Sequence, residues 1–245
     1  MERLPSISIV IPAYNEERRL PATLGSILDY LGSRDWPQWE VVVVNDGSKD
    51  RTAAVAAEFA AEHAGIRLLE NPGNRGKGYS VRHGMLEAKG DWVLFTDSDL
   101  SAPIEELDKL MAAAREQGAS VAIGSRALNR GLIQVHQSLF RETAGRVFNL
   151  LMRVATGLPF ADTQCGFKLF ERGAAQEIFR RQRIERWGFD AELLFIARRL
   201  GYKTIEVPVR WSHSEGTKVS MFGDSLNMFL DLLRIRRNQL RGLYR

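Results

Sequence analysis

Residues 92–99 read Trp-Val-Leu-Phe-Thr-Asp-Ser-Asp, a short apolar run that ends in two carboxylates. An apolar run of this length is typical of a strand buried on both faces of a parallel sheet. The same arrangement occurs twice earlier, where Ala13-Tyr-Asn-Glu16 follows residues 7–11 and Asn45-Asp-Gly-Ser48 follows residues 41–44. Because ligands bind beyond the carboxyl ends of parallel strands, the three polar clusters are predicted to meet in one crevice.

Apolar runs alternate with helical periodicity through the first half of the chain, which predicts a βαβ succession. Strands are predicted at 7–11, 41–44, 66–69, 92–95 and 121–123, and helices at 22–31, 52–63, 80–88 and 104–116. The second half predicts an amphipathic stretch at 137–156, a polar segment at 162–168, a helix at 191–200 and a strand at 204–209. The predicted fold is α/β: a Rossmann-like, mostly parallel central sheet flanked by helices, with a helical region on its C-terminal side.

Charge is distributed unevenly along the 245 residues, whose formal net charge is +4. The chain ends in a cluster without acids, here called the basic tail: Arg234, Arg236, Arg237, Arg241 and Arg245. Such a tail favours an anionic surface. No nucleic-acid-binding signature accompanies it, so we expect membrane phosphates and no nucleic acid as its partner. We expect neither a signal peptide nor a spanning helix, since no apolar stretch reaches the roughly 18 residues required.

The pair Asp97 and Asp99 is the strongest candidate for a metal site. The two carboxylates stand at positions i and i+2 where a strand ends, so both can turn toward one cation, and hard oxygen ligands suit Mg²⁺ or Mn²⁺. An isolated Asp-x-Asp is more often an ordinary acidic turn. The convergence of the polar clusters at the same sheet edge favours the metal site over that alternative.

The segment Asn74-Arg-Gly-Lys-Gly78 is glycine-rich and basic at a predicted helix start, which is typical of a diphosphate cradle. It matches neither the Walker A motif nor the dinucleotide fingerprint, which disfavours P-loop kinases and nicotinamide enzymes. Asp46 could accept hydrogen bonds from a base or ribose, although helix capping would explain Asp-Gly-Ser about as well.

Arginines and histidines elsewhere give weaker signals. Arg126 and Arg141 are candidate anion ligands by position and charge, and a solvated surface arginine is the alternative for each. Cys165 has no histidine near it in sequence, which leaves a thiol nucleophile without support. The histidines lack metal-ligand spacing: His63, His83, His136 and His213.

Five motifs together resemble the family 2 glycosyltransferases of the GT-A fold in order and spacing. They are Val10-Ile-Pro-Ala-Tyr-Asn-Glu16, Asn45-Asp-Gly-Ser48, Gly76-Lys-Gly78, Asp97-x-Asp99 and Gly124-Ser-Arg126. Three longer motifs resemble one branch of that family, the dolichyl-phosphate β-glucosyltransferases. They are Asp162-Thr-Gln-Cys-Gly-Phe-Lys-Leu-Phe170, Glu185-Arg-Trp-Gly-Phe-Asp190 and Glu215-Gly-Thr-Lys218.

The resemblance implies an inverting, Mg²⁺- or Mn²⁺-dependent transfer of glucose from UDP-glucose to a polyprenyl phosphate, giving a β-linked product. It implies that the nucleoside is held by Pro12, Tyr14, Glu16 and Asp46. Lys77 would bind the phosphates, Asp97 and Asp99 the metal, and Asp97 with Ser98 would also contact the nucleotide sugar. The acceptor phosphate would meet Arg126 and Arg141, and the transfer site would be lined by Gln164, Asp190 and Lys218.

The resemblance also suggests how the chain is divided. We expect one domain over residues 1–245, with a nucleotide-sugar half at 1–125, an acceptor half at 126–212 and an amphipathic, basic, membrane-proximal segment at 213–245. Because the eukaryotic enzyme has an N-terminal anchor that we do not expect here, we expect a cytoplasmic protein held peripherally on the cytosolic face of a membrane. Lys168 is expected to add positive charge around the acceptor, and Asp190 to organise the site rather than to take a proton.

Three alternatives remain open from the sequence. The first is a GDP-mannose-dependent polyprenyl-phosphate mannosyltransferase, because no local signature separates glucose from mannose. The second is a family 2 enzyme that acts on a hydroxyl acceptor. The third, a catalytically inactive scaffold of the same fold, is disfavoured by the intact carboxylates at Asp97 and Asp99.

Overall fold

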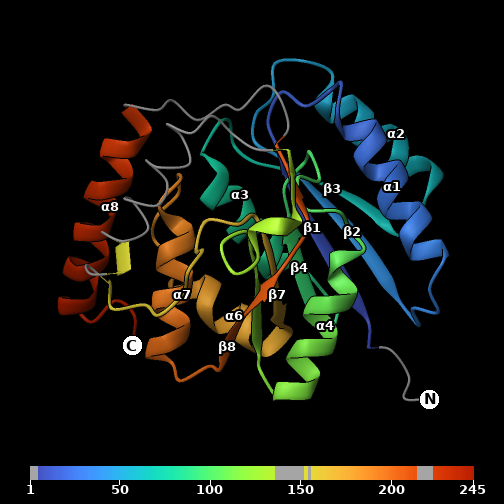
Figure 1. Cartoon of the computed structure of the whole chain (residues 1–245). Helices are drawn as coiled ribbons and strands as arrows, with labels where there is room; N and C mark the ends of the chain where they lie inside the picture. The colour runs from blue at the N-terminus through green and yellow to red at the C-terminus, as the bar shows by residue number, and fades with distance from the viewer. Residues whose placement is uncertain (1–4, 136–151, 154–155, 214–222) are drawn as a thin grey trace.

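The computed structural model describes residues 5–135, 152–153, 156–213 and 223–245 (Figure 1). The strands are β1 (Ile7–Ala13), β2 (Trp39–Asn45), β3 (Ile66–Glu70), β4 (Trp92–Thr96), β5 (Val121–Ser125), β6 (Ile133–Val135), β7 (Phe167–Glu171), β8 (Thr204–Pro208) and β9 (Trp211–Ser212). The helices are α1 (Leu20–Gly32), α2 (Thr52–Glu62), α3 (Lys77–Glu87), α4 (Glu106–Gln117), η1 (Arg130–Leu132), α6 (Arg172–Arg181), α7 (Phe189–Arg199) and α8 (Gly223–Leu240).

The central sheet has seven strands in the order β3-β2-β1-β4-β7-β5-β8. Strand β1 pairs in parallel with β2 and β4, β2 with β3, and β5 with β8. Only β7 runs antiparallel to its neighbours β4 and β5 in this sheet. A short parallel pair, β6 and β9, lies outside it. The predicted mostly parallel α/β sheet is therefore confirmed.

The sequence pattern did not predict β7 and α6. The polar segment expected over 162–168 ends inside β7, and Lys168 interrupts the apolar pattern of that strand. The strand is nevertheless buried because it lies between β4 and β5. Leu169 of β7 pairs with Leu94 of β4 on one side and with Ala122 of β5 on the other. Since this pairing joins segments far apart in sequence, local periodicity could not reveal it.

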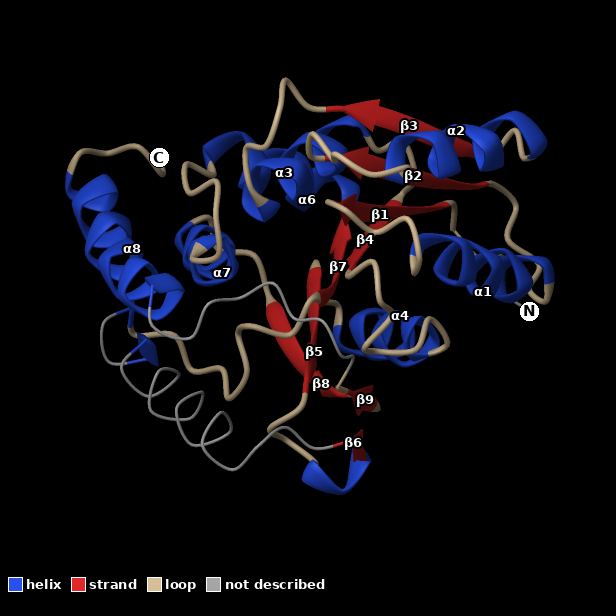
Figure 2. Cartoon of the chain, turned by 90° about the horizontal axis from the view of Figure 1, so that it is seen from above, coloured by secondary structure: helices blue, strands red, loops and turns tan. Residues whose placement is uncertain are grey.

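Each face of the sheet carries its own core, because side chains alternate along a strand. On β1, Ile9 and Ile11 join the core under α1, α2 and α4, whereas Val10 joins the core under α3, α6 and α7. On β2, Val43 and Val44 divide in the same way. Figure 2 shows these two groups of helices on opposite faces of the sheet. The loops at the carboxyl ends of the strands are thereby held by helices from both sides.

Helix α8 packs outside α7, farther from the sheet (Figures 1 and 2). Leu232, Ile235 and Tyr244 are buried in the same core as Phe195 of α7. Within the described ranges, none of the helices is both long and apolar enough to cross a bilayer. The amphipathic stretch predicted at 137–156 falls almost wholly outside the described residues.

Candidate active site

The polar cluster after β4 forms a tight turn at the edge of the sheet. The amide of Leu100 donates to the Asp97 carbonyl at 3.2 Å, and Leu100 has a positive φ of 45°. The Asp99 carboxylate accepts from the Ser101 amide at 3.0 Å. Thr23 of α1 donates to the Ser98 carbonyl at 2.6 Å, so the turn is fixed to the neighbouring helix.

The three predicted clusters meet at this edge. Lys77 Nζ, at the start of α3, lies 2.5 Å from Asp97 Oδ1. The Asn15 amide donates to Ser48 Oγ at 2.9 Å, which joins the loops after β1 and β2. Burial would lower the pKa of Lys77, but attraction to Asp97, Asp190 and Asp99 outweighs it and raises this pKa. The predicted convergence is confirmed, and Lys77 stays cationic among three carboxylates.

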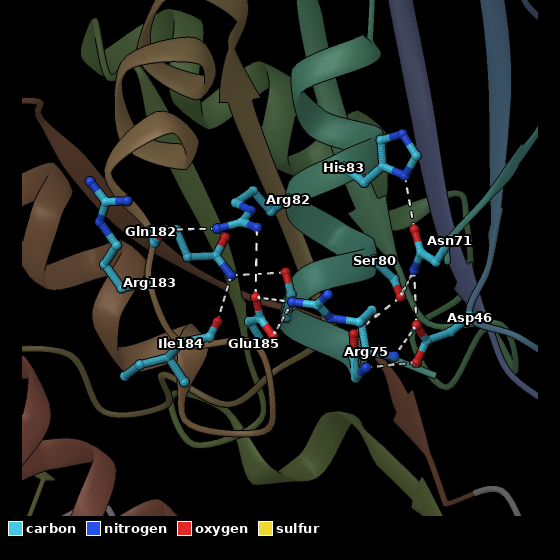
Figure 3. A network of polar contacts seen from close by, with 12 residues as sticks. Asp46, Asn71, Arg75, Ser80, Arg82, His83, Gln182, Arg183, Ile184 and Glu185 are labelled. Carbon is cyan, nitrogen blue, oxygen red and sulfur yellow. Dashed lines mark hydrogen bonds and ion pairs between the residues drawn. The ribbon is translucent and has the colours of Figure 1, made fainter. Parts of the chain in front are cut away.

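Asp46 lies beside the glycine-basic loop, which comprises residues 73–78, and contacts it through hydrogen bonds (Figure 3). Its Oδ1 accepts from the Arg75 amide at 2.9 Å and from Asn71 Nδ2 at 2.9 Å, and its Oδ2 accepts from the Gly76 amide at 2.8 Å. Only 3% of Asp46 is exposed. In this structure the carboxylate therefore shapes the glycine-basic loop, and its contact with a nucleoside stays a prediction.

The loop after β1 contains the other residues predicted to hold the nucleoside. Pro12 is buried within β1, and Tyr14 is half-buried in the loop. The Glu16 carboxylate accepts from Arg19 Nε at 2.7 Å and Nη2 at 2.9 Å, and the Glu16 amide donates to Thr52 Oγ1 at 2.7 Å. Glu16 thus fixes the loop to α1 and α2, while its contact with the nucleoside stays a prediction.

Asp190 stands in the first turn of α7 and forms an ion pair with Lys168 of β7. Lys168 Nζ also donates to the Cys165 carbonyl at 2.5 Å and lies 5.1 Å from the centre of the Phe95 ring. Lys168 is fully buried and its ammonium group is paired with Asp190, so the positive charge that it was expected to add around the acceptor stays a prediction. The sequence did not predict the ion pair between Lys168 and Asp190. This pair fits the organising role expected for Asp190.

Arg126 is held by Asp162, which opens one of the longer sequence motifs but was not predicted as a site residue. Asp162 Oδ2 accepts from Arg126 Nε at 2.6 Å and from its amide at 3.0 Å, and Oδ1 accepts from Nη2 at 2.8 Å. Burial would raise the pKa of Asp162, but the adjacent guanidinium outweighs it and lowers this pKa to about 2. The guanidinium carbon also lies 5.4 Å from the Trp211 ring centre.

Thr163 and Gln164, which follow Asp162, each carry a buried polar atom without a hydrogen-bond partner among the described residues. These atoms are Thr163 Oγ1 and Gln164 Nε2. Buried polar atoms are usually paired, so an unpaired one favours contact with a ligand. The predicted place of Gln164 at the transfer site agrees with this observation.

Gly166, in the same segment as Thr163 and Gln164, packs directly against Asp97. A Cβ atom at this position would lie 2.1 Å from Asp97 Oδ2, so only glycine fits without moving the carboxylate. Gly166 belongs to the motif that begins at Asp162, but the sequence did not predict it as a site residue. Arg141 and Lys218, two further predicted site residues, lie outside the described residues.

Asp97 and Asp99 fit a divalent cation by the chemistry of their oxygens. The Lys77 ammonium group on Asp97 shows that this carboxylate accepts positive charge here. Among the described residues, no group of three or more His, Cys, Asp or Glu side chains could hold a metal ion. Two carboxylates would therefore need ligands from a bound molecule, and diphosphate oxygens are suitable.

Comparisons with known proteins agree with this geometry. Residues 8–179 match the family model described as glycosyl transferase family 2. A dolichyl-phosphate beta-glucosyltransferase of Trichomonas vaginalis, ALG5D, is 42% identical over 240 residues, covering 94% of this chain and 72% of that protein. A dolichyl-phosphate beta-glucosyltransferase of Homo sapiens is 36% identical over 263 residues, covering 100% of this chain and 81% of that protein.

Solved structures establish the fold. Glucosyl-3-phosphoglycerate synthase from Mycobacterium tuberculosis, in complex with Mn²⁺, UDP-glucose and phosphoglyceric acid, superposes with a TM-score of 0.66 at 21% identity. That match covers 94% of this chain and 79% of the other. A mannosyltransferase from Pyrobaculum calidifontis, in complex with GDP-Man and Mn²⁺, superposes with a TM-score of 0.60 at 20% identity, covering 89% and 59%. With this GT-A fold and these relatives, the chain belongs to glycosyltransferase family 2 and, within it, to the dolichyl-phosphate β-glucosyltransferases.

Proposed function

We propose that this glycosyltransferase transfers glucose from UDP-glucose to dolichyl phosphate or another polyprenyl phosphate. The contact between Lys77 and Asp97 supports this proposal most directly, because it joins the loop that we propose binds phosphate to a carboxylate that we propose binds the metal. The activity named for the Trichomonas vaginalis and human relatives supports the acceptor and the sugar. The neighbour solved with UDP-glucose and Mn²⁺ supports the base and a divalent metal.

The donor diphosphate would lie at the N-terminus of α3, where the helix dipole and backbone amides favour anions. Lys77 would neutralise part of its charge. A divalent cation, when held by Asp97 and Asp99, would stabilise the negative charge that develops on the departing nucleotide. An acceptor phosphate oxygen would form the new bond to the anomeric carbon as the bond to UDP breaks. One displacement inverts the anomeric centre and gives a β-linked product from an α-linked donor.

The acceptor needs positive charge more than a base. A phosphate monoester has a second pKa near ~6, so at neutral pH it is mostly a dianion. Arg126 and Arg141 would supply charge to this dianion, with Asp162 orienting Arg126. Asp190 would hold Lys168 and α7 in place, and Gln164 would donate to the sugar or phosphate.

We propose that the protein acts in the cytoplasm, bound peripherally to the cytosolic face of a membrane. The exposed surface of α8 and the residues after it combines the basic tail with apolar side chains, namely Leu230, Leu233, Leu240 and Leu243. A helix surface with both kinds of side chain is typical of binding at an anionic lipid surface. The free, buried Cys165 is compatible with a reducing compartment.

The test is transfer of radiolabel into the organic phase from a panel of nucleotide sugars, with a polyprenyl phosphate or the matching polyprenyl alcohol as acceptor. We expect label from UDP-glucose with the phosphate and none with the alcohol. Label from GDP-mannose would favour a mannosyltransferase instead. Equal use of the alcohol would overturn the phosphate assignment.

The pH profile separates the acceptor from Asp190. Activity should rise through an acid limb near ~6 as the acceptor phosphate loses its second proton. Burial raises the pKa of Asp190, with the Lys168 and Lys77 ammonium groups opposing it, so the titration of this carboxyl has to be separated from that of the acceptor. The limb should persist in Asp190→Asn even if the plateau falls. Its loss in that variant would make Asp190 a general base.

A further inference from the structure

The last residues of the chain reach a buried carboxylate in α7. Tyr244, which follows α8, donates from its hydroxyl to Glu192 Oε1 at 2.5 Å. Asn238 Nδ2 donates to the same hydroxyl at 3.1 Å. Tyr244 is 3% exposed and Glu192 is fully buried. The end of the chain is thus fixed to the interior by a hydrogen bond to a buried acid.

The other oxygen of Glu192 holds the loop between α6 and α7, here called the connecting loop and comprising residues 182–188. Glu192 Oε2 accepts from the Arg183 amide at 3.0 Å and from the Ile184 amide at 2.8 Å. Two backbone amides on one carboxylate fix the start of this loop. Tyr244 and the connecting loop therefore share Glu192.

The connecting loop packs directly against the glycine-basic loop (Figure 3). Gln182 Nε2 donates to the Gly78 carbonyl at 2.8 Å, and the Tyr79 amide donates to the Glu185 carbonyl at 3.0 Å. A Cβ atom at Gly76 would lie 2.6 Å from the Glu185 carbonyl oxygen, and one at Gly78 would lie 2.7 Å from the Ile184 carbonyl oxygen. At this separation, a shift of one loop must move the other.

We propose that Tyr244 and Glu192 are positioning residues through which the C-terminal helix sets the affinity of the glycine-basic loop for the nucleotide diphosphate. The proposal rests on the proposed function in one respect, namely that this loop binds the sugar donor. Neither residue is among those that we propose bind the donor or the acceptor. Their effect passes through backbone hydrogen bonds of the connecting loop, so it falls on donor binding and leaves acceptor binding unchanged.

Tyr244→Phe tests the link because it removes one hydroxyl and keeps the aromatic packing against Phe195. We expect the Kd for UDP, measured by calorimetry with metal present, and the KM for UDP-glucose to rise about tenfold, within the usual range of coupling between separate sites. The KM for polyprenyl phosphate should not change. A change confined to the donor distinguishes positioning from a general loss of structure.

Tyr30→Phe is the matched control. Tyr30 is 4% exposed and donates to Asp108 Oδ1 at 2.7 Å, so it is also a buried tyrosine paired with a carboxylate, but it joins α1 to α4. The Tyr30→Phe variant should leave the Kd for UDP unchanged. If Tyr244→Phe does not fold, Asn238→Ala is the second variant. It removes the hydrogen bond that the half-buried Asn238 donates to the Tyr244 hydroxyl and should also raise the Kd for UDP.

The proposal is overturned if Tyr244→Phe binds UDP with the wild-type Kd, or if Tyr30→Phe weakens UDP binding by the same factor. It is also overturned if, in Tyr244→Phe, the KM for polyprenyl phosphate rises as much as the KM for UDP-glucose. Titrating the wild type with UDP and with GDP first identifies the nucleotide to use. A preference for GDP would refute the proposed UDP donor and leave the link testable with GDP. Gly78→Ala completes the set, since unchanged nucleotide binding in this variant would show that the loop is not the donor site.

Discussion

Replacing Asp162 with asparagine is expected to lower the free energy of unfolding by about 2–3 kcal/mol at pH 7. Burial alone would raise the pKa of Asp162, but attraction to Arg126 lowers it from 3.8 to about 2. At about 1.36 kcal/mol per pH unit, this lowering is worth about 2.4 kcal/mol of stability. Asp162 is 7% exposed, so solvent screens the pair little.

The pH dependence gives this prediction a distinctive signature. Because the pKa of Asp162 is lower in the folded than in the unfolded state, its stabilisation is complete above about pH 4 and is lost as the pH falls toward 2. The difference between wild type and Asp162→Asn should therefore shrink to about half at pH 3. Urea denaturation at pH 7 and at stepwise lower pH measures both unfolding free energies.

Glu58→Gln serves as the control for the assay. Glu58 pairs with Arg51 at 3.0 Å, but the two side chains are 60% and 72% exposed, so its loss should cost less than about 1 kcal/mol. A similarly small cost for Asp162→Asn, or a difference that stays constant down to pH 3, would refute the pairing as a source of stability. It would also remove the basis for Asp162 as the residue that orients Arg126.

Three further perturbations test the site, the loop and the surface. Asp97→Asn or Asp99→Asn, like added chelator, should reduce turnover at least about 100-fold with the fold intact, and undiminished transfer would refute the metal role. Gly78→Ala should destabilise the fold by about 1–3 kcal/mol and weaken UDP binding, since its Cβ would overlap the Ile184 carbonyl. Changing the first four arginines of the basic tail to glutamine should weaken sedimentation with anionic vesicles by about 1 kcal/mol each, and salt should do the same. Unchanged sedimentation would assign the tail another role.

The sequence by itself determined the alternating strands, their burial and the edge at which polar residues gather. These features are local: an apolar run predicts a buried strand, and the residues that follow it must lie at its carboxyl end. Asp97, Asp46 and Lys77 were therefore predictable as members of one site before any contact was known. The longer motifs around Asp162 and Asp190 identified the branch of the family.

Only the tertiary structure decided which partner each polar side chain takes. Strand β7 is inserted antiparallel between β4 and β5, and this pairing buries Lys168 against Asp190. The carboxylate of Asp46 binds backbone amides about thirty residues away, and Tyr244 meets Glu192 across 52 residues. Such contacts depend on how distant segments pack, and hydrophobic periodicity carries no information about them. The sequence thus placed the charged groups at one edge, and long-range packing determined which partner within the protein each of them takes.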